Sequence, residues 1–175
     1  MAPAVIRVEQ PGDERRIREI QALAFRRPDA PDEEPVEAGL VDDLRRSDAW
    51  IPELSLVAVL DDELVGHVVC SRAHVLPDTP VLGLGPIGVL PDHQGNGVGR
   101  ALVEAVLDAA DTRGEPLVAL LGSPAFYGRF GFVRSTDRHI DPPDDSWGDH
   151  FQVRTLGIYD DAIAGRFRYA AAFQT

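Results

Sequence analysis

One stretch constrains the fold of this chain more than any other, because an apolar run breaks there into a glycine-rich turn and then into a helix. Residues 81–90 are apolar or glycine apart from Pro86, which predicts a buried strand. After the turn, apolar residues recur at helical spacing, at Val98, Leu102, Val106 and Ala110. The sequence therefore predicts a strand, a tight turn and a helix in direct succession.

The turn between Gln94 and Arg100 has the chemistry of an anion site. Gly95, Gly97 and Gly99 carry no Cβ, so the backbone can turn tightly and a charged ligand can approach the amides closely. Amides at a helix N-terminus lack intrahelical partners and together carry about half a positive charge. We therefore expect a pyrophosphate to bind the amides of residues 96–100. A turn that binds nothing is the alternative.

Two nucleotide-binding motifs share part of this pattern. A dinucleotide fold needs G-x-G-x-x-G, but the spacing here is G-x-G-x-G, and Arg100 stands where the last glycine or alanine belongs. Glu115 also precedes the next apolar strand instead of ending it. A Walker loop is excluded because no Gly-Lys-Ser/Thr follows. A nicotinamide or flavin site stays as a third interpretation.

The turn resembles the acetyl-coenzyme A signature of the GNAT N-acetyltransferase superfamily, Q/R-x-x-G-x-G/A. This signature is matched by Gln94-Gly95-Asn96-Gly97-Val98-Gly99, and Val89-x-Pro91 before it resembles the family's strand-to-turn junction. Farther along, Tyr127-Gly-Arg-Phe-Gly131-Phe132 resembles the family's Y-x-x-x-G-F element. The string from Leu121 to Phe132 and the closing R-Y-A-A-A-F resemble the YhbS-like branch of this superfamily.

The resemblance implies an α/β (α+β) fold in which residues 1–175 form a single domain. Its sheet would be mixed and mostly antiparallel, with about seven strands, flanking helices, and splayed fourth and fifth strands at 81–90 and 116–121. Hydrophobic patterning and turn residues predict the other elements. These are strands at 5–8, 56–60, 64–72, 152–156 and 167–169, helices at 13–25, 36–46 and 124–130, and a loop at 26–35.

The resemblance also implies acetyl-coenzyme A as the cosubstrate, with its pyrophosphate on the turn and its pantetheine along the fourth strand. The residues expected to bind it are Ile87, Gly88, Val89, Gln94, Gly95, Asn96, Gly97, Val98, Gly99, Arg100, Ser123 and Tyr127. The backbone of Val89 is expected to contact the oxyanion of the reaction, at a strand end that Pro86 and the glycines make irregular.

In the family that this sequence resembles, the position matched by Tyr127 often serves as general acid toward the departing thiolate. A phenol with a pKa of about 10 is protonated at neutral pH and can donate that proton. The alternative is that Tyr127 and its neighbouring phenylalanines only form an aromatic core. Ser123 stands where many members have an asparagine.

No carboxylate lies between Val81 and Leu90, so the general base is unidentified. Four side chains remain open as candidates, although each also suits a surface role: His74, Glu33, Glu34 and Glu37. His93 could approach a phosphate or simply be an exposed loop residue. No histidine or cysteine cluster has the spacing of a metal site, so we expect no metal.

Charge and composition argue against several classes of binding partner and location. A formal net charge of −12 argues against nucleic acid, and no apolar run is long enough to cross a bilayer. The start of the chain lacks the pattern of a secretory signal, which predicts a cytoplasmic location. The single cysteine, Cys70, lies among apolar residues and is expected to be a buried thiol.

These observations lead to one functional hypothesis and one main alternative. The resemblance implies an enzyme, an N-acetyltransferase that moves the acetyl group directly to a primary amine in a ternary complex. The acceptor is expected to be a small molecule, and a homodimer is left open. The alternative is a catalytically inactive module that binds acyl-coenzyme A for regulation.

Overall fold

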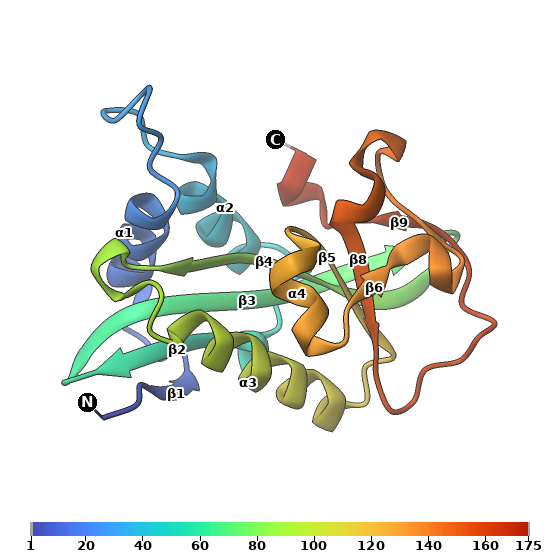
Figure 1. The fold of residues 1–175 in the computed structure, drawn as a ribbon, viewed down its shortest axis with the longest axis horizontal. Helices are drawn as coiled ribbons and strands as arrows, with labels where there is room; N and C mark the ends of the chain where they lie inside the picture. Colours follow the sequence, from blue (N-terminus) through green and yellow to red (C-terminus); the bar gives the residue numbers. More distant parts are fainter. Residues whose placement is uncertain (1, 175) are drawn as a thin grey trace.

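The computed structural model describes residues 2–174 (Figure 1). The first half of the chain forms β1 (Val5–Val8), α1 (Glu14–Ala24), α2 (Val36–Arg45), β2 (Ser55–Leu60), β3 (Glu63–Val75) and β4 (Thr79–Val89). The second half forms α3 (Val98–Arg113), β5 (Leu117–Leu121), α4 (Pro124–Tyr127), β6 (Val133–Arg134), β7 (Ile140–Asp141), β8 (Phe151–Thr155) and β9 (Gly165–Arg168). Short 3-10 helices include η3 (Gly128–Phe130), η5 (Asp145–His150) and η6 (Ala171–Gln174).

The strands form one mixed sheet that is mostly antiparallel, as expected. Its main path runs β1-β2-β3-β4-β5-β8-β6, while β9 pairs with the far end of β3 and with β7. The parallel pair β4–β5 is joined by α3, and β7–β9 is also parallel. The described residues contain two more strands than the expected seven, because the two-residue strands β6 and β7 are too short to leave a periodic signal.

The fourth and fifth strands part soon after they meet. Their pairing is limited to Leu82 with Val118 and Gly83 with Ala119. Beyond this point a bulge interrupts β4, since Ile87 pairs with Val68 but Leu84 pairs with Cys70. The extra residue lies at Gly85-Pro86, where Gly85 has a φ of +138° and the peptide bond to Pro86 is cis. The irregular strand end that the sequence predicts is therefore present.

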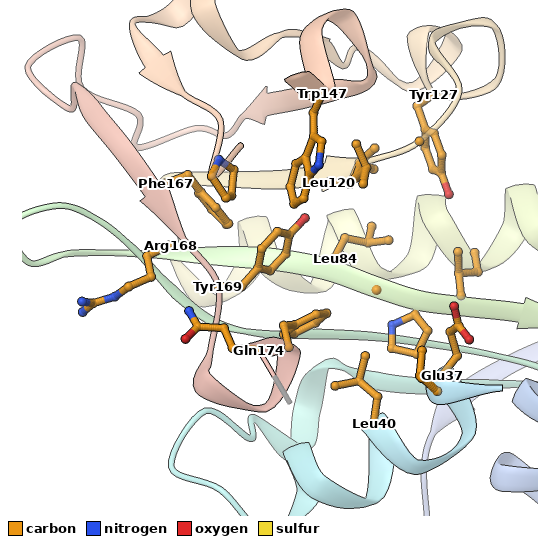
Figure 2. A pocket seen from close by; sticks show the side chains of 18 of the residues that line it. Glu37, Leu40, Leu84, Leu120, Tyr127, Trp147, Phe167, Arg168, Tyr169 and Gln174 are labelled. Atoms are coloured by element: carbon orange, nitrogen blue, oxygen red, sulfur yellow. The ribbon is translucent and has the colours of Figure 1, made fainter. Parts of the chain in front are cut away.

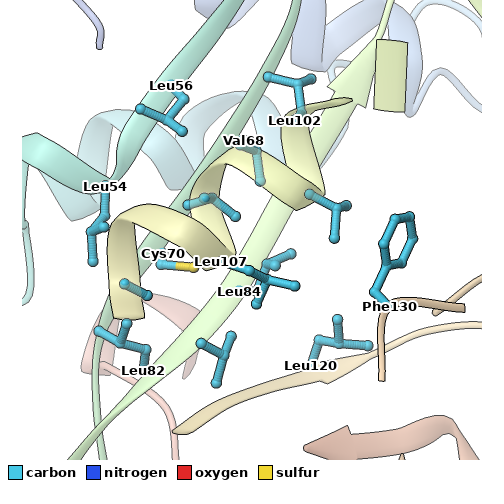
Figure 3. Close-up of a cluster of buried hydrophobic side chains, with 14 of the residues drawn as sticks. Leu54, Leu56, Val68, Cys70, Leu82, Leu84, Leu102, Leu107, Leu120 and Phe130 are labelled. Carbon is cyan, nitrogen blue, oxygen red and sulfur yellow. The ribbon is translucent and has the colours of Figure 1, made fainter. Parts of the chain in front are cut away.

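The helices cover opposite faces of the sheet. Leu56 and Ala58 of β2 belong to the same buried cluster as Leu102 of α3, whereas Val57 between them packs with Ile17 of α1. Because side chains alternate between the faces of a strand, α1 and α3 must lie on different sides. Figure 3 shows the larger cluster, in which α3 lies over β3 and β4.

A second apolar cluster lies at the other end of the sheet. It is built around Phe151 of β8 and Phe167 of β9, whose ring centroids are 5.2 Å apart. The C-terminal η6 contacts α2 nearby, so segments from the two ends of the sequence meet. Among residues 2–174, no helix combines the length and the hydropathy that a membrane span requires.

A chain of hydrogen bonds runs through the buried space between α1 and the sheet. Gln21 Nε2 lies 2.9 Å from His67 Nδ1, and His67 Nε2 lies 2.8 Å from the Ser55 hydroxyl. That hydroxyl donates to Glu9, whose carboxylate also accepts from Arg45. Gln21, Ser55 and His67 are fully buried. This chain therefore connects α1 with β2, β3 and the residue that follows β1.

Candidate functional site

The start of α3 offers free backbone amides to a ligand. Gly97 is the N-cap and has a φ of +87°, a left-handed conformation that glycine adopts without strain. The amide of Ala101 donates to the Gly97 carbonyl, so the helical hydrogen bonds begin there, and no side chain caps the residues before it. The first turn also contains no acidic residue. These conditions favour an anionic ligand at residues 98–100.

The loop before α3 is held against the end of β4. The Gln94 side chain donates to the Val89 carbonyl at 3.0 Å, and the Leu90 amide donates to Val65 of β3. Val98 is buried in the core, so only its amide can reach a ligand. The exposed Arg100 is paired with Glu104. Among the residues expected to bind the cofactor, Gln94 therefore holds the loop in place. The backbone amides of residues 98–100 are the groups left for the ligand.

The end of β4 presents amides toward the gap beside it. Successive peptide groups of a strand point to opposite edges. The Leu90 amide points toward β3, so the amides of Ile87 and Val89 point to the edge where β4 has parted from β5. Gly88 lies between them and faces Gln21, whose Oε1 would be only 2.6 Å from a Cβ at this position.

A cavity of about 930 Å³ opens over this part of β4 (Figure 2). Its lower wall comes from α2 and its upper wall from α4 and η5, while the C-terminal segment closes one end. Ile87 and Ser123, which the sequence predicts as cofactor residues, both line it. Gly88 and Val89 do not, and the loop from Gln94 to Arg100 lies outside this cavity. The residues predicted to bind the cofactor therefore lie partly in the cavity wall and partly at the end of β4 and in the loop before α3.

Tyr127 belongs both to the aromatic core and to the cavity wall. Its ring centroid lies 4.8 Å from that of Phe126 and 5.8 Å from that of Phe132, both in edge-to-face geometry. Its hydroxyl points from α4 toward β4 (Figure 2). Burial raises the pKa of Tyr127, so the phenol stays protonated at neutral pH. The ring of Tyr127 therefore packs in the aromatic core while its residue also lines the cavity.

The fold separates the candidates for the general base. Glu37 lies in the first turn of α2 and lines the cavity. Glu33 is paired with Arg27 and Glu34 with Arg18, and neither residue lines the cavity. His74 lies on β3 opposite Arg168 and lines a separate hollow. Sequence alone could not separate the three glutamates, because they lie within five residues of one another.

Other titratable groups have structural partners. Glu115, which a dinucleotide site would need for a ribose, forms a two-pronged ion pair with Arg72 at 2.7 and 2.8 Å. These contacts lower the pKa of Glu115 against the opposing effect of burial. Cys70 is fully buried, as expected, and burial raises the pKa of its thiol. Within the described part of the chain, no three His, Cys, Asp or Glu side chains form a group that could hold a metal.

Comparisons with known proteins find similar sequences and similar solved structures. Residues 15–132 match the model of the acetyltransferase (GNAT) family. The chain is 34% identical over 163 residues to the uncharacterized N-acetyltransferase YhbS of Escherichia coli (strain K12), covering 92% of this chain and 91% of that protein. The crystal structure of E. coli YhbS in complex with CoA superimposes with a TM-score of 0.87 at 32% identity, covering 100% of this chain and 94% of the other.

A second solved structure shows a similar likeness. A GNAT family acetyltransferase from Brucella melitensis, in complex with acetyl-CoA, is 33% identical and superimposes with a TM-score of 0.79. The superposition covers 97% of each chain. The likeness to both structures therefore extends over almost the whole length of the sequence.

Proposed function

This chain belongs to the acetyltransferase (GNAT) family, and on that premise we propose that it transfers the acetyl group of acetyl-CoA directly to a small primary amine. Residues 1–175 would act as a single catalytic domain. The observation that carries the proposal is the set of uncapped amides at the start of α3, beside the gap between β4 and β5. The two similar structures hold CoA and acetyl-CoA.

The donor would lie along the parted strands. Its pyrophosphate would accept hydrogen bonds from the amides of residues 98–100, where no acidic side chain competes. Its pantetheine would follow the free edge of β4, where the Ile87 and Val89 amides point. Ser123 lines the same space and would contact the pantetheine.

The acetyl group would pass directly from the donor to the acceptor, without a covalent enzyme intermediate. The ammonium group of the acceptor first loses a proton, and the nitrogen lone pair attacks the thioester carbonyl carbon. The carbonyl oxygen becomes an oxyanion, and the attacking nitrogen loses a second proton. The carbonyl then re-forms as the bond from carbon to sulfur breaks, and the sulfur leaves as a thiolate that takes up one proton. The products are an amide, CoA thiol and one proton. Cys70 takes no part, because its thiol is fully buried and its pKa is raised.

Two groups of this chain would stabilise the reaction. The outward amide of Val89 would donate to the oxyanion, and one such donor contributes about 10²–10³ in rate. The Tyr127 hydroxyl would protonate the departing thiolate and regain its proton from water, a role worth about 10²–10⁴. A buried phenol suits this role because it is kept protonated until the thiolate forms.

Titration of acetyl-CoA by calorimetry tests the donor site. Wild-type protein should bind, and Gly97→Glu should not, because the new carboxylate repels the pyrophosphate. Gly114→Glu is the matched control, since Gly114 ends the same helix with a φ of +82° and also has no atom within 4 Å of a Cβ. Folded wild-type protein that binds no acetyl-CoA would overturn the proposal.

Thiol release separates an enzyme from the alternative, a catalytically inactive module that binds acyl-CoA for regulation. An enzyme releases CoA thiol when an amine is added, whereas the module binds acetyl-CoA without turnover. The position of Tyr127 in the cavity wall favours the enzyme. A panel of alkyl, aromatic and polyamine acceptors, each assayed with a thiol reagent, makes the comparison.

A further inference from the structure

The cavity beside Tyr127 extends toward an aromatic wall that the proposed donor does not explain. Trp147, Phe167 and Tyr169 line this part, away from Tyr127 and Glu37 (Figure 2). Tyr169 contacts Phe167 with a centroid distance of 4.8 Å and lies 6.4 Å from Trp147. Phe173 of η6 lies 4.6 Å from Tyr169 and completes the wall. These four residues are named the aromatic wall.

The charged groups of the cavity are unevenly placed. Glu37 is the only carboxylate among the described residues that line it, and it has no ion pair. Arg166 is bound to the Pro142 carbonyl and to Asp145. The guanidinium of Arg168 points away from the Tyr169 ring (Figure 2). A ligand in the cavity therefore meets one free carboxylate at the Tyr127 side and an apolar surface at the other.

From this arrangement we infer that the acceptor is a primary amine carried on a short linker from an aromatic or similarly bulky apolar group. The inference rests on the proposed function and specifies the acceptor for that same site. The ammonium lies near Glu37, within reach of the acetyl group, and the apolar body packs against the aromatic wall. Offset and edge-to-face ring contacts favour an aromatic body over an aliphatic chain.

The same chemistry argues against other amines. A polyamine carries further cations that would have to be buried against Trp147 and Phe167 without carboxylate partners. An amino acid would place its carboxylate beside Glu37. A longer acyl chain on the donor is the remaining ligand that could pack against the aromatic wall, and the experiment below includes it as an outcome.

The test compares two amines that differ in their apolar body. Calorimetric titration of 2-phenylethylamine and of butylamine into protein saturated with CoA measures acceptor binding without turnover. Thiol release from acetyl-CoA gives kcat/KM for the same two amines. We expect 2-phenylethylamine to exceed butylamine about tenfold or more in both measurements, because the ring buries more apolar surface.

Three variants and one control test the two ends of the cavity separately. Phe173→Ala removes part of the aromatic wall and should weaken only 2-phenylethylamine, about three- to tenfold. Trp147→Ala, in a half-buried position, repeats this test at a second place. Glu37→Gln should weaken both amines about tenfold, because both carry the ammonium group. Glu34→Gln removes the same charge outside the cavity and is its matched control.

The outcomes separate this inference from the proposed function. Thiol release that is equal or faster with butylamine or spermidine overturns the inference and leaves acetyl transfer standing. Octanoyl-CoA that outperforms acetyl-CoA, with Phe173→Ala reversing the preference, also overturns it, because the wall then holds the donor. Selective binding of 2-phenylethylamine without any thiol release supports the acceptor class and overturns acetyl transfer.

Discussion

Gly122 lies directly against the ring of Tyr127. A Cβ at this position would be 2.5 Å from Cε2 and 2.9 Å from Cδ2 of that ring. Gly122 is fixed in place because its amide donates to the His150 carbonyl and its own carbonyl accepts from Gln152. A side chain at Gly122 must therefore displace Tyr127 rather than move away from it.

Gly122→Ala is expected to reduce thiol release about tenfold to a hundredfold, because a shift of about 1 Å in a reacting group has an effect of that size. Acetyl-CoA binding should change little, since the start of α3 is unaffected. Initial rates and calorimetric titration of the same preparation measure the two quantities.

Gly128→Ala is the control for this substitution. Gly128 follows Tyr127, has an ordinary helical φ of −56°, and has no atom within 4 Å of a Cβ. The Gly128→Ala enzyme should release thiol at the wild-type rate. A Gly122→Ala enzyme with full activity would show that the position of the Tyr127 ring does not limit the reaction.

At the scale of elements, α3 combines a buried stripe with an unsatisfied N-terminus. Leu102, Val106 and Ala110 are fully buried against the sheet, and they hold the helix in a fixed orientation. Left-handed glycines lie at both ends, Gly97 and Gly114. The amides at the start of α3 are therefore positioned by packing farther along the helix, rather than by a capping side chain.

Leu102→Ala is expected to lower the free energy of unfolding by about 2–5 kcal/mol, because it leaves a cavity under α3. Urea denaturation followed by circular dichroism gives this quantity. Leu121→Ala removes the same atoms from a side chain that is 46% exposed and should lower it by about 1 kcal/mol or less. Equal losses in the two variants would contradict the importance of this packing.

At the scale of the whole molecule, His67 lies in the buried chain that links α1 to three parts of the sheet. Burial, together with the charge of Arg45, lowers the pKa of His67 from 6.5 to about 3. Glu9 lies 3.9 Å from Nε2, but its carboxylate is already paired with Arg45. Folded protein therefore keeps the imidazole neutral, while the unfolded chain binds a proton below about pH 6.5.

The free energy of unfolding should consequently fall as the pH is lowered from about 6.5 toward 4.5. The unfolded state binds one more proton in this range, which corresponds to about 1.4 kcal/mol per pH unit. Urea unfolding at half-unit pH steps measures the slope. Carboxylates with lowered pKa values, such as Asp13 and Glu115, add to this loss as the pH falls to their unfolded values, at the lower end of this range and below it.

His67→Gln should flatten this slope, because glutamine does not titrate. The exposed His150 serves as the control, and His150→Gln should keep the wild-type slope. An unchanged slope in His67→Gln would show that the buried histidine does not set the acid sensitivity of the fold.

The local order of elements was predictable because it depends on neighbours in the sequence. The two apolar runs on either side of a polar turn that predict the hairpin β2–β3, and the helical spacing that predicts α3, are signals that act over a few residues. Both elements formed as expected. β6 and β7 were missed because a two-residue strand exists only through its partner. The last strand was expected at 167–169 but covers Gly165–Arg168, because its ends depend on pairing with β3 and β7.

The sequence by itself determined the turn from Gln94 to Arg100, since its glycines and the helix start are contiguous and need no distant partner. Only the tertiary structure decided which acidic residue faces the cavity, that Trp147 and Phe173 share one wall, and that His67 is neutral. The physical reason is the sequence separation over which each kind of interaction acts. Backbone preferences act between neighbours in the chain, whereas cavities, ion pairs and shifted pKa values arise from residues that only the folded topology brings together.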